Sequence, residues 1–224
     1  MNLSHLARLC LCAALPLMTS ACSTTTAKAP DYTAFHSAKP RSILVLPPVN
    51  HTPDVNASNG LIAQMTHPLA EGGYYVVPVA VEIETFRQNG LDTPDDIMQA
   101  PAAKLQSVFG ADAALYTTIT AYGSVYQVLS SNTVVTATSK LVDLKTGSVL
   151  WSGSATANSS DVGDPQVAAG GIIGLLVTAA VKQAVHNLTD QSFDVAHVAA
   201  ERLLRVGPPD GMLYGPRSVK YGTD

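Results

Sequence analysis

Residues that could carry acid–base or metal chemistry are spread singly along the chain. The histidines beyond the N-terminal segment each stand in an apolar stretch or a loop: His36, His51, His67, His186 and His197. No H-E-x-x-H helix, G-x-S-x-G elbow, Walker loop or paired-cysteine zinc spacing occurs. Asp95 and Asp96 follow Thr93 and Pro94, which is typical of a helix start rather than of a catalytic acid pair. We therefore expect no catalytic residue, no metal site and no cofactor.

The charge of the chain is low and slightly negative. Its 224 residues include 13 Lys and Arg against 17 Asp and Glu, a formal net charge of −4. Nucleic-acid-binding domains carry clustered positive charge, so we expect no nucleic-acid partner. The hydrophobic share of 46% is enough to build a core, which excludes wholesale disorder.

A stripe of tyrosines could form a recognition surface. Residues 115–129 alternate, which places Leu115 and Ile119 on one face of a strand and Tyr116, Tyr122 and Tyr126 on the other. A pocket near Tyr122 and Tyr126 would support an alternative function, as a small-ligand receptor or an enzyme. Tyrosine and threonine stripes are also ordinary in strands.

Residues 1–21 have the pattern of a secretory signal. Arg8 supplies a positive start, and residues 9–18 form an apolar run. That run is about ten residues long, whereas a membrane-spanning helix needs roughly twenty. A cleaved signal therefore fits better than a permanent anchor.

The end of this segment resembles the bacterial lipoprotein signal, in which small residues precede a cysteine. The resemblance implies cleavage after Ala21, acylation of the Cys22 thiol with diacylglycerol, and acylation of the new amine. Thr19 departs from the Leu, Val or Ile that this family prefers three residues before the cysteine. The alternative is an ordinary signal cleavage that leaves Cys22 as a free thiol. By analogy with lipoprotein sorting in enteric bacteria, Ser23 favours the outer membrane.

Composition divides the chain into four segments. Residues 1–21 are the signal, and residues 22–40 are a lipid anchor and a flexible tether rich in Thr, Ala, Ser and Pro. Residues 41–207 form a single α/β domain, and residues 208–224 an extended C-terminal tail. Tyr32 and Phe35 could dock the far end of the tether onto the domain.

The domain begins with alternating strands and helices. Apolar runs predict strands at residues 42–49 and 74–79, where Pro78 places the second strand at an edge or a strand end. Helical spacing predicts helices at residues 56–71 and 82–89, and a further helical stretch from Thr93 to Gly110. A third strand is expected to start near Ala113.

The second half of the domain predicts a meander followed by helices. Strands at residues 115–129, 134–144 and 149–157 are joined by turns at 130–132 and 145–147, which force antiparallel pairing. Helices are expected within residues 163–188 and at 192–206. The fold class is therefore α/β, with a mixed sheet, a βαβα start, an antiparallel three-strand meander and two C-terminal helices.

Two regions could pair the chain with a second copy. Gly170 and Gly174 would let another backbone approach closely. The tail contains more apolar and aromatic residues than an unattached terminus needs, and it docks either along its own domain or on a neighbouring protomer. We therefore name Gly170, Gly174, Leu213 and Tyr214 as candidate residues of a homodimer interface.

Six stretches carry a family resemblance: residues 39–48 (KPRSILVLPP), 68–75 (PLAEGGYY), 126–131 (YQVLSS), 141–147 (LVDLKTG), 150–153 (LWSG) and 213–218 (LYGPRS). They resemble a family of bacterial lipoproteins of unknown function that includes a meningococcal surface vaccine antigen. The resemblance implies a fold like the amino-terminal α/β domain of TolB, with a comparable relation to curli-secretion channel lipoproteins. It also implies an auxiliary role beside an envelope transporter and dimerisation through the C-terminal tail.

Together these features predict a lipid-anchored outer-membrane protein that faces the periplasm and acts by binding. It would be a subunit or accessory of a cell-envelope transport or assembly complex. The expected partners are the membrane through the N-terminal lipid, a second copy of the chain, and an envelope transporter or curli-channel-like lipoprotein.

Overall fold

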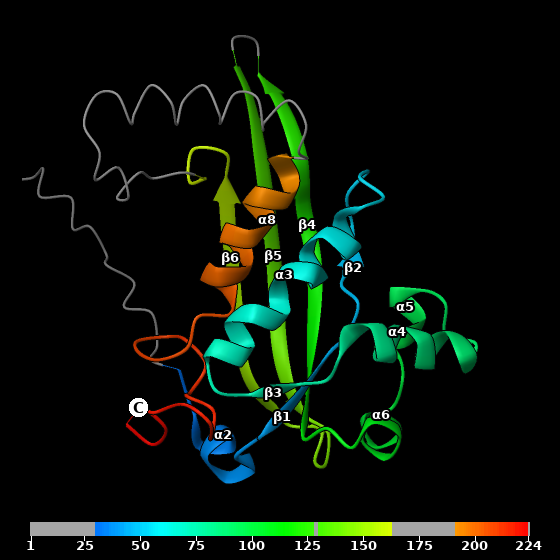
Figure 1. Ribbon diagram of the computed structural model, residues 1–224, viewed down its shortest axis with the longest axis vertical. Helices are drawn as coiled ribbons and strands as arrows, with labels where there is room; N and C mark the ends of the chain where they lie inside the picture. Colours follow the sequence, from blue (N-terminus) through cyan, green and yellow to red (C-terminus); the bar gives the residue numbers. More distant parts are fainter. Residues whose placement is uncertain (1–29, 128–129, 163–190, 224) are drawn as a thin grey trace, which may run out of the picture.

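The computed structural model describes residues 30–127, 130–162 and 191–223, which form one sheet with helices packed on it (Figure 1). The strand order is β3-β1-β4-β5-β6, and β2 also pairs with β4. The elements in chain order are α2 (Thr33–Ala38), β1 (Ser42–Val45), β2 (Val49–Asn50), α3 (Ala57–Glu71), β3 (Tyr75–Val76), α4 (Val79–Gln88), α5 (Pro94–Met98), α6 (Ala102–Phe109), β4 (Ala113–Gln127), β5 (Ser130–Asp143), β6 (Val149–Asn158) and α8 (Gln191–Leu203).

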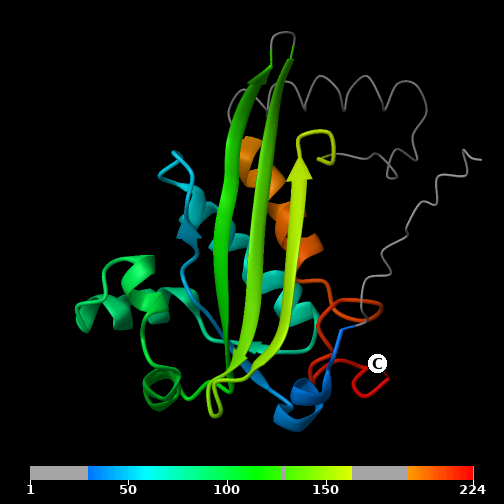
Figure 2. The same ribbon diagram turned by 180° about the vertical axis from the view of Figure 1, so that it is seen from behind.

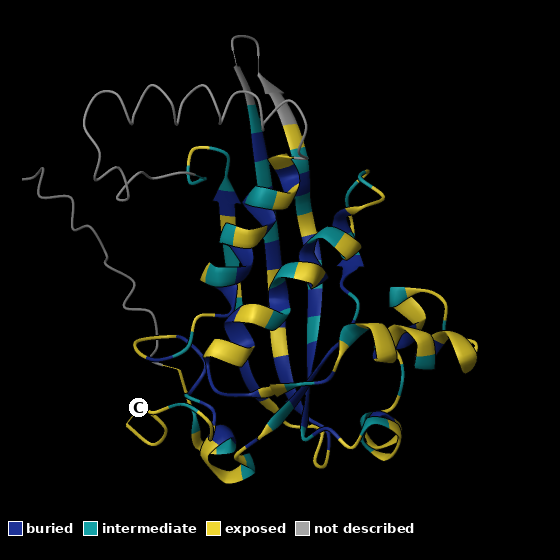
Figure 3. Cartoon of the chain, in the orientation of Figure 1, coloured by how far each residue is buried: buried dark blue, intermediate teal, exposed yellow. Residues whose placement is uncertain are grey.

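The first half of the sheet is parallel, as the alternation of strands and helices predicts. β1 pairs in parallel with β3 on one side and with β4 on the other. Residues 43–46 are completely buried, because α3 and α8 cover one face of the sheet and α4 to α6 cover the other. Figure 3 shows this burial on the strands behind α3 and α8. A strand covered on both faces reads as a continuous apolar run.

The second strand is shorter than its sequence suggests. β3 contains only Tyr75 and Val76, at the edge of the sheet next to β1. Pro78 has no N–H to donate to a ladder, and α4 starts at the residue that follows it, Val79. The edge position inferred from Pro78 is confirmed, whereas the predicted strand end at residue 79 is wrong.

The helical stretch expected from Thr93 to Gly110 is two helices. Thr93 caps α5 by accepting a hydrogen bond from the Asp96 N–H at 3.2 Å, so the predicted cap is confirmed. The chain leaves the helix before Pro101, because the residue ahead of a proline is disfavoured in helical conformation. α6 then runs to Gly110, whose φ of 66° ends it.

The meander is confirmed, but a bulge changes which side chains face the core. β4 and β5 pair in one register up to Ile119↔Ala137 and shift by one residue at Ala121↔Thr136. One extra residue in a strand moves the following side chains to the opposite face. Tyr122 therefore lies in the core, 7% exposed, against α3 rather than beside Tyr116. Its assignment to the outer face is wrong, whereas the pocket expected near Tyr122 and Tyr126 stays a prediction, because the Tyr126 side chain lies outside the described residues.

The two hairpin turns differ in how well the sequence locates them. Gly147 has a φ of 76°, and the Asp143 carboxylate accepts the Thr146 N–H at 3.0 Å, which fixes the predicted turn. The first turn lies earlier than expected, because Gln127 pairs with Ser130 and residues 130–132 belong to β5. The polar Ser-Ser-Asn run reads as a turn, but it forms part of an extended strand end.

Two helices lie across the front of the sheet. α3 occupies the predicted range and continues past Pro68, which removes one helical hydrogen bond without ending the helix. α8 buries Val195, Ala199 and Leu203 against the sheet, and it ends at Leu203, three residues before the predicted end. From behind, Figure 2 shows the other face of β4, β5 and β6 largely uncovered. The helix expected within residues 163–188 lies outside the described residues.

One acid of the described residues is completely buried, in the first turn of α4. The Glu82 side chain is completely buried, and neither carboxyl oxygen has a hydrogen-bond partner in the described structure. Burial raises the pKa of Glu82 to about 9, which outweighs the opposing effect of the Val45 backbone at the end of β1. The carboxyl is therefore protonated in the folded protein at neutral pH.

A raised pKa makes folding stability depend on pH in a defined direction. Between pH 4.5 and about 9 the folded state keeps a proton that the unfolded state releases, so the free energy of unfolding falls as pH rises. Glu82→Gln should flatten this slope and stabilise the protein by about 2 kcal/mol at pH 7. Denaturant unfolding across this pH range measures both effects.

The matched control is Glu84→Gln on the same helix. Glu84 is exposed and pairs with Arg87 at 2.8 Å, so its replacement should leave stability nearly unchanged, because surface ion pairs contribute little. A wild-type stability that increases from pH 5 to pH 9 would contradict a buried neutral Glu82.

Candidate binding site where the two ends of the chain meet

The C-terminal tail packs on its own domain. Met212 is completely buried and Leu213 is 8% exposed, and both belong to the main core cluster. Val206 pairs with Met212, and the Trp151 indole N–H donates to the Asp210 carbonyl at 3.1 Å. The tail of this single chain therefore docks along its own domain, and a homodimer interface at Leu213 and Tyr214 stays a prediction. Leu213 is not accessible to a second copy while the tail is docked.

Three glycines allow the tail to cross the domain. The Gly215 N–H donates to the Gly72 carbonyl at 2.8 Å, and the Arg217 N–H donates to the Gly73 carbonyl at 3.0 Å. A Cβ on Gly73 would lie 2.4 Å from the Ser218 nitrogen, and one on Gly215 would lie 2.6 Å from the Gly73 backbone. The two backbones thus touch where a side chain has no room.

The N-terminal segment joins the tail at the same end of the sheet. α2 lies within the stretch expected to be tether, and its Phe35 is 3% exposed in the main core. The Tyr32 hydroxyl donates to the Gly211 carbonyl, which ties the segment to the tail. Docking through Tyr32 and Phe35 is confirmed. The folded part of the chain therefore begins before the boundary expected at Arg41.

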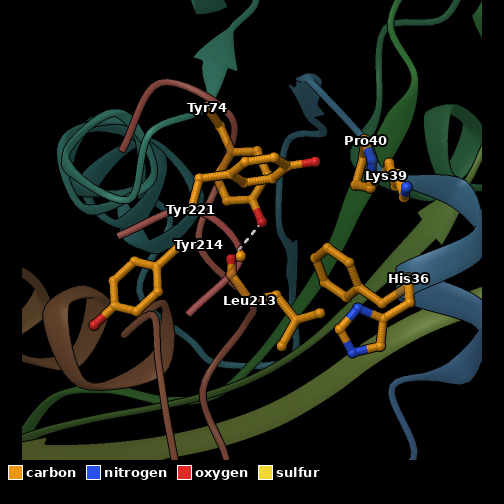
Figure 4. A pocket seen from close by; sticks show the side chains of 9 residues that line it. His36, Lys39, Pro40, Tyr74, Leu213, Tyr214 and Tyr221 are labelled. Carbon is orange, nitrogen blue, oxygen red and sulfur yellow. Dashed lines mark hydrogen bonds between the residues drawn. The ribbon is translucent and has the colours of Figure 1, made fainter. Parts of the chain in front are cut away.

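A cavity of ≈ 280 Å³ lies between α2 and the tail (Figure 4). His36, Lys39 and Pro40 lie on one side, and Tyr214 and Tyr221 lie on the other. Tyr74 donates its hydroxyl hydrogen to the Leu213 carbonyl. The full lining is Phe35, His36, Lys39, Pro40, Tyr74, Leu213, Tyr214, Tyr221 and Gly222. Aromatic walls with two exposed basic side chains suit a ligand that has apolar surface and negative or acceptor groups.

A second hollow of ≈ 470 Å³ lies on the other side of the tail crossing, with both Arg41 and Arg217 in its wall. The Arg217 guanidinium lies 5.3 Å from the centre of the Tyr75 ring. One oxygen of the Asp112 carboxylate accepts the Arg41 N–H at 2.8 Å and both the N–H and the hydroxyl of Ser42. Asp112 thus fastens the start of β1, and the arginine side chains remain exposed.

Both hollows lie at the amino ends of the parallel strands. Lys39 and Pro40 precede β1, Tyr74 precedes β3, and Asp112 precedes β4. In open α/β sheets, ligands usually bind outside the carboxyl ends of the strands. In this chain the carboxyl end of β1 lies beside Glu82 and the first turn of α4.

The remaining candidate residues are not brought together. Ala21, Cys22, Gly170 and Gly174 lie outside the described residues, as does the side chain of Tyr126. In the described part of the chain, His, Cys, Asp and Glu form no group of three that could hold a metal.

Sequence reasoning missed the meeting of α2 with the tail. Stretches 39–48, 68–75 and 213–218, which carry the family resemblance, converge at this cavity. Both terminal segments contain aromatic residues and prolines and have no helix or strand periodicity. This pattern predicted that each segment docks, but it did not indicate the surface on which each one docks.

The fold and its two joined ends define an α/β protein with the expected mixed sheet. The chain belongs to the family described as "Putative lipoprotein GNA1162-like", whose model matches residues 30–217. This confirms the family expected from the sequence. No helix in the described parts of the chain has the length and apolar character needed to cross a membrane.

Two proteins of Neisseria meningitidis agree with this assignment. "Putative lipoprotein NMB1124/NMB1162" of Neisseria meningitidis serogroup B is 46% identical over 204 residues, covering 91% of this chain and 93% of that protein. The crystal structure of lipoprotein GNA1162 from Neisseria meningitidis matches 65% of this chain and 99% of its own, with 46% identity and a TM-score of 0.51. TolB from Acinetobacter baumannii matches 72% of this chain and 30% of its own, with 17% identity and a TM-score of 0.29.

The close contact between the tail and Gly73 predicts the effect of one substitution. Gly73→Ala should displace the tail, because the new Cβ would overlap the Ser218 backbone in addition to straining a φ of 94°. We expect a loss of at least about 2 kcal/mol of stability and faster trypsin cleavage after Arg217 and Lys220. Thermal unfolding and limited proteolysis measure these effects.

Gly90→Ala is the matched control. Gly90 has a φ of 75°, but a Cβ there would meet no atom within 4 Å, so only backbone strain of about 1 kcal/mol should appear. Equal trypsin sensitivity in the two variants would show that the crossing does not hold the tail.

Proposed function

We propose that this chain is a lipid-anchored outer-membrane protein, facing the periplasm, that acts by binding as a subunit or accessory of a cell-envelope transport or assembly complex. Membership of a lipoprotein family supports the anchor. The residues that would carry it are Cys22, as the acylated residue, and Ala21, as the last residue of the cleaved signal. Several acyl chains on one residue give stable anchoring, whereas a single chain is marginal. Ser23 supports sorting to the outer membrane.

The observation that carries the binding role is the cavity between α2 and the tail. Its walls combine buried aromatic rings, which are rigid, with the exposed basic groups of His36 and Lys39. Rigid aromatic surface with a few polar groups is the usual composition of a recognition site. The described residues contain no arranged acid, base and nucleophile around this cavity, so recognition fits the site better than catalysis does.

The position of the cavity supports a partner near the membrane. The described chain begins at Pro30, seven residues after Ser23, and α2 follows directly. Acylation at Cys22 would therefore hold the cavity close to the membrane surface. A transporter or channel lipoprotein in the same membrane is the class of partner that we propose.

The anchor predicts the effect of one substitution. Cys22→Ala should prevent acylation and leave either uncleaved precursor or a soluble periplasmic protein. Detergent partitioning together with mass spectrometry of the mature N-terminus distinguishes these products. An unacylated N-terminus on the wild-type protein would refute the lipid anchor.

The binding role predicts where a partner can be captured. With p-benzoylphenylalanine in place of His36, which is exposed on α2, irradiation of intact cells should give a discrete protein adduct. Gly73→Ala should abolish that adduct, because it displaces one wall of the cavity.

The control position for crosslinking is Val55, which is 85% exposed in the loop between β2 and α3. It lies away from the cavity, so the photoreactive residue there should not give the same adduct. Identical adducts from both positions, or none from position 36, would count against a partner at this site.

A further inference from the structure

Exposed positive charge collects at one end of the long axis of the domain. α2, the tail, α6 and the β5–β6 turn all lie at that end (Figure 1, Figure 2), which we call the anchor end. These segments and the start of β1 carry six exposed cations that have no ion pair among the described residues: Lys39, Arg41, Lys104, Lys145, Arg217 and Lys220.

The acids of the anchor end are mostly engaged. Asp112 and Asp143 accept backbone N–H groups, and Asp210 pairs with Arg205. Asp31 is exposed and accepts the Thr33 N–H. Glu71 is exposed directly before the Gly72–Gly73 crossing and has no ion pair among the described residues. Eight other acids lie on other parts of the surface: Asp54, Glu84, Asp92, Asp95, Asp96, Asp161, Asp194 and Glu201. With Arg205 included, the described residues of the anchor end thus carry seven Lys and Arg against five Asp and Glu, so this end is net positive although the chain is negative overall.

Two apolar residues at the same end are exposed next to two of these cations. Val219 is 100% exposed and Tyr221 is 49% exposed, with Arg217 and Lys220 beside them in the sequence. The Tyr221 N–H donates to the Ser218 carbonyl at 3.1 Å, which folds the segment into a turn. An exposed aliphatic residue flanked by cations and tyrosine is typical of surfaces that lie at the headgroup level of a membrane.

The length of chain outside the structure fixes which end can approach the membrane. From Cys22 to Pro30 an extended backbone spans at most about 28 Å. β4 alone, with 15 residues, is about 50 Å long. A lipid on Cys22 would therefore keep the anchor end near the membrane, and the opposite end would point away.

We propose that the anchor end docks on the membrane that holds the lipid, where its cations bind the phosphates of anionic lipid headgroups and Val219 and Tyr221 enter the headgroup layer. This inference rests on the proposed lipid anchor for its geometry. Arg41 and Arg217 line one hollow, in which the Asp112 carboxylate accepts the N–H groups of Arg41 and Ser42, and their guanidinium groups suit bidentate binding of phosphate. Each cation near an anionic surface strengthens binding roughly fivefold.

A vesicle assay without the lipid tests the surface separately from the anchor. The mature chain from residue 22, carrying Cys22→Ser, is mixed with vesicles of phosphatidylglycerol and phosphatidylcholine, or of phosphatidylcholine alone, and floated on a density gradient. The protein should float only with the vesicles that contain phosphatidylglycerol, and added salt should release it. Flotation with both vesicle types, with neither, or independent of salt would overturn the proposal.

Two lysines provide a matched pair of variants. Lys220 lies 5.5 Å from the centre of the Tyr214 ring at the anchor end, and Lys140 lies 5.3 Å from the centre of the Tyr116 ring on the uncovered sheet face. Lys220→Gln should weaken vesicle binding roughly fivefold, and Lys220→Gln with Arg217→Gln more than tenfold. Lys140→Gln removes the same charge and should have little effect. Equal losses for Lys220→Gln and Lys140→Gln would show that net charge, rather than this surface, governs binding.

Two exposed valines provide labelling positions that show which end of the protein contacts the membrane. With Cys22 replaced, Val219→Cys or Val55→Cys supplies a single cysteine for an environment-sensitive dye. Vesicles that contain phosphatidylglycerol should shift the emission of the dye to the blue at position 219 and not at position 55. The reverse result, or equal shifts, would overturn the orientation. The vesicle assays use unacylated protein, so a negative result would refute the membrane-docking surface alone. Acylation of Cys22 is tested separately by the Cys22→Ala experiment.

Discussion

The contact between the tail backbone and Gly72–Gly73 is the constraint on which the arrangement of the anchor end depends. Gly72, Gly73 and Gly215 have no side chains, so the two main chains approach closely enough for direct hydrogen bonds. This approach brings Leu213 under the Tyr74 hydroxyl and places Met212 in the core. The cavity, the second hollow and the position of α2 all follow from this crossing.

The fold could be predicted where local pattern decides the structure, and much less where distant segments meet. β1 is a short apolar run ended by prolines, and Gly147 marks a tight turn, so the parallel start and the second hairpin were predictable. Tyr122 was misplaced because one extra residue at the β4 bulge reverses the alternation, and no period in the sequence signals it. The break before α6 was readable from Pro101, but the apolar spacing on both sides obscured it.

The candidate site could be predicted only in its parts. Phe35 and Leu213 stand out as apolar residues in otherwise polar segments, but they are separated by most of the chain. Their meeting depends on a close approach between backbones, which side-chain patterning does not encode. The sheet places the amino ends of its parallel strands beside the two terminal segments. These segments supply most of the side chains that line the cavity. A fold class shared with other proteins therefore says little about what is bound.

The docking of the tail also sets the order in which this protein can reach its native state. Met212 and Leu213 complete a core that Phe35 enters from the other end of the chain. Met212 and Leu213 are synthesised after α2 and α8, so no nascent chain can close this core before both residues have left the ribosome. A chain that stops short of Met212 would keep an open apolar surface next to α2 and α8, which proteases and chaperones recognise. Closure of the core therefore waits for the tail.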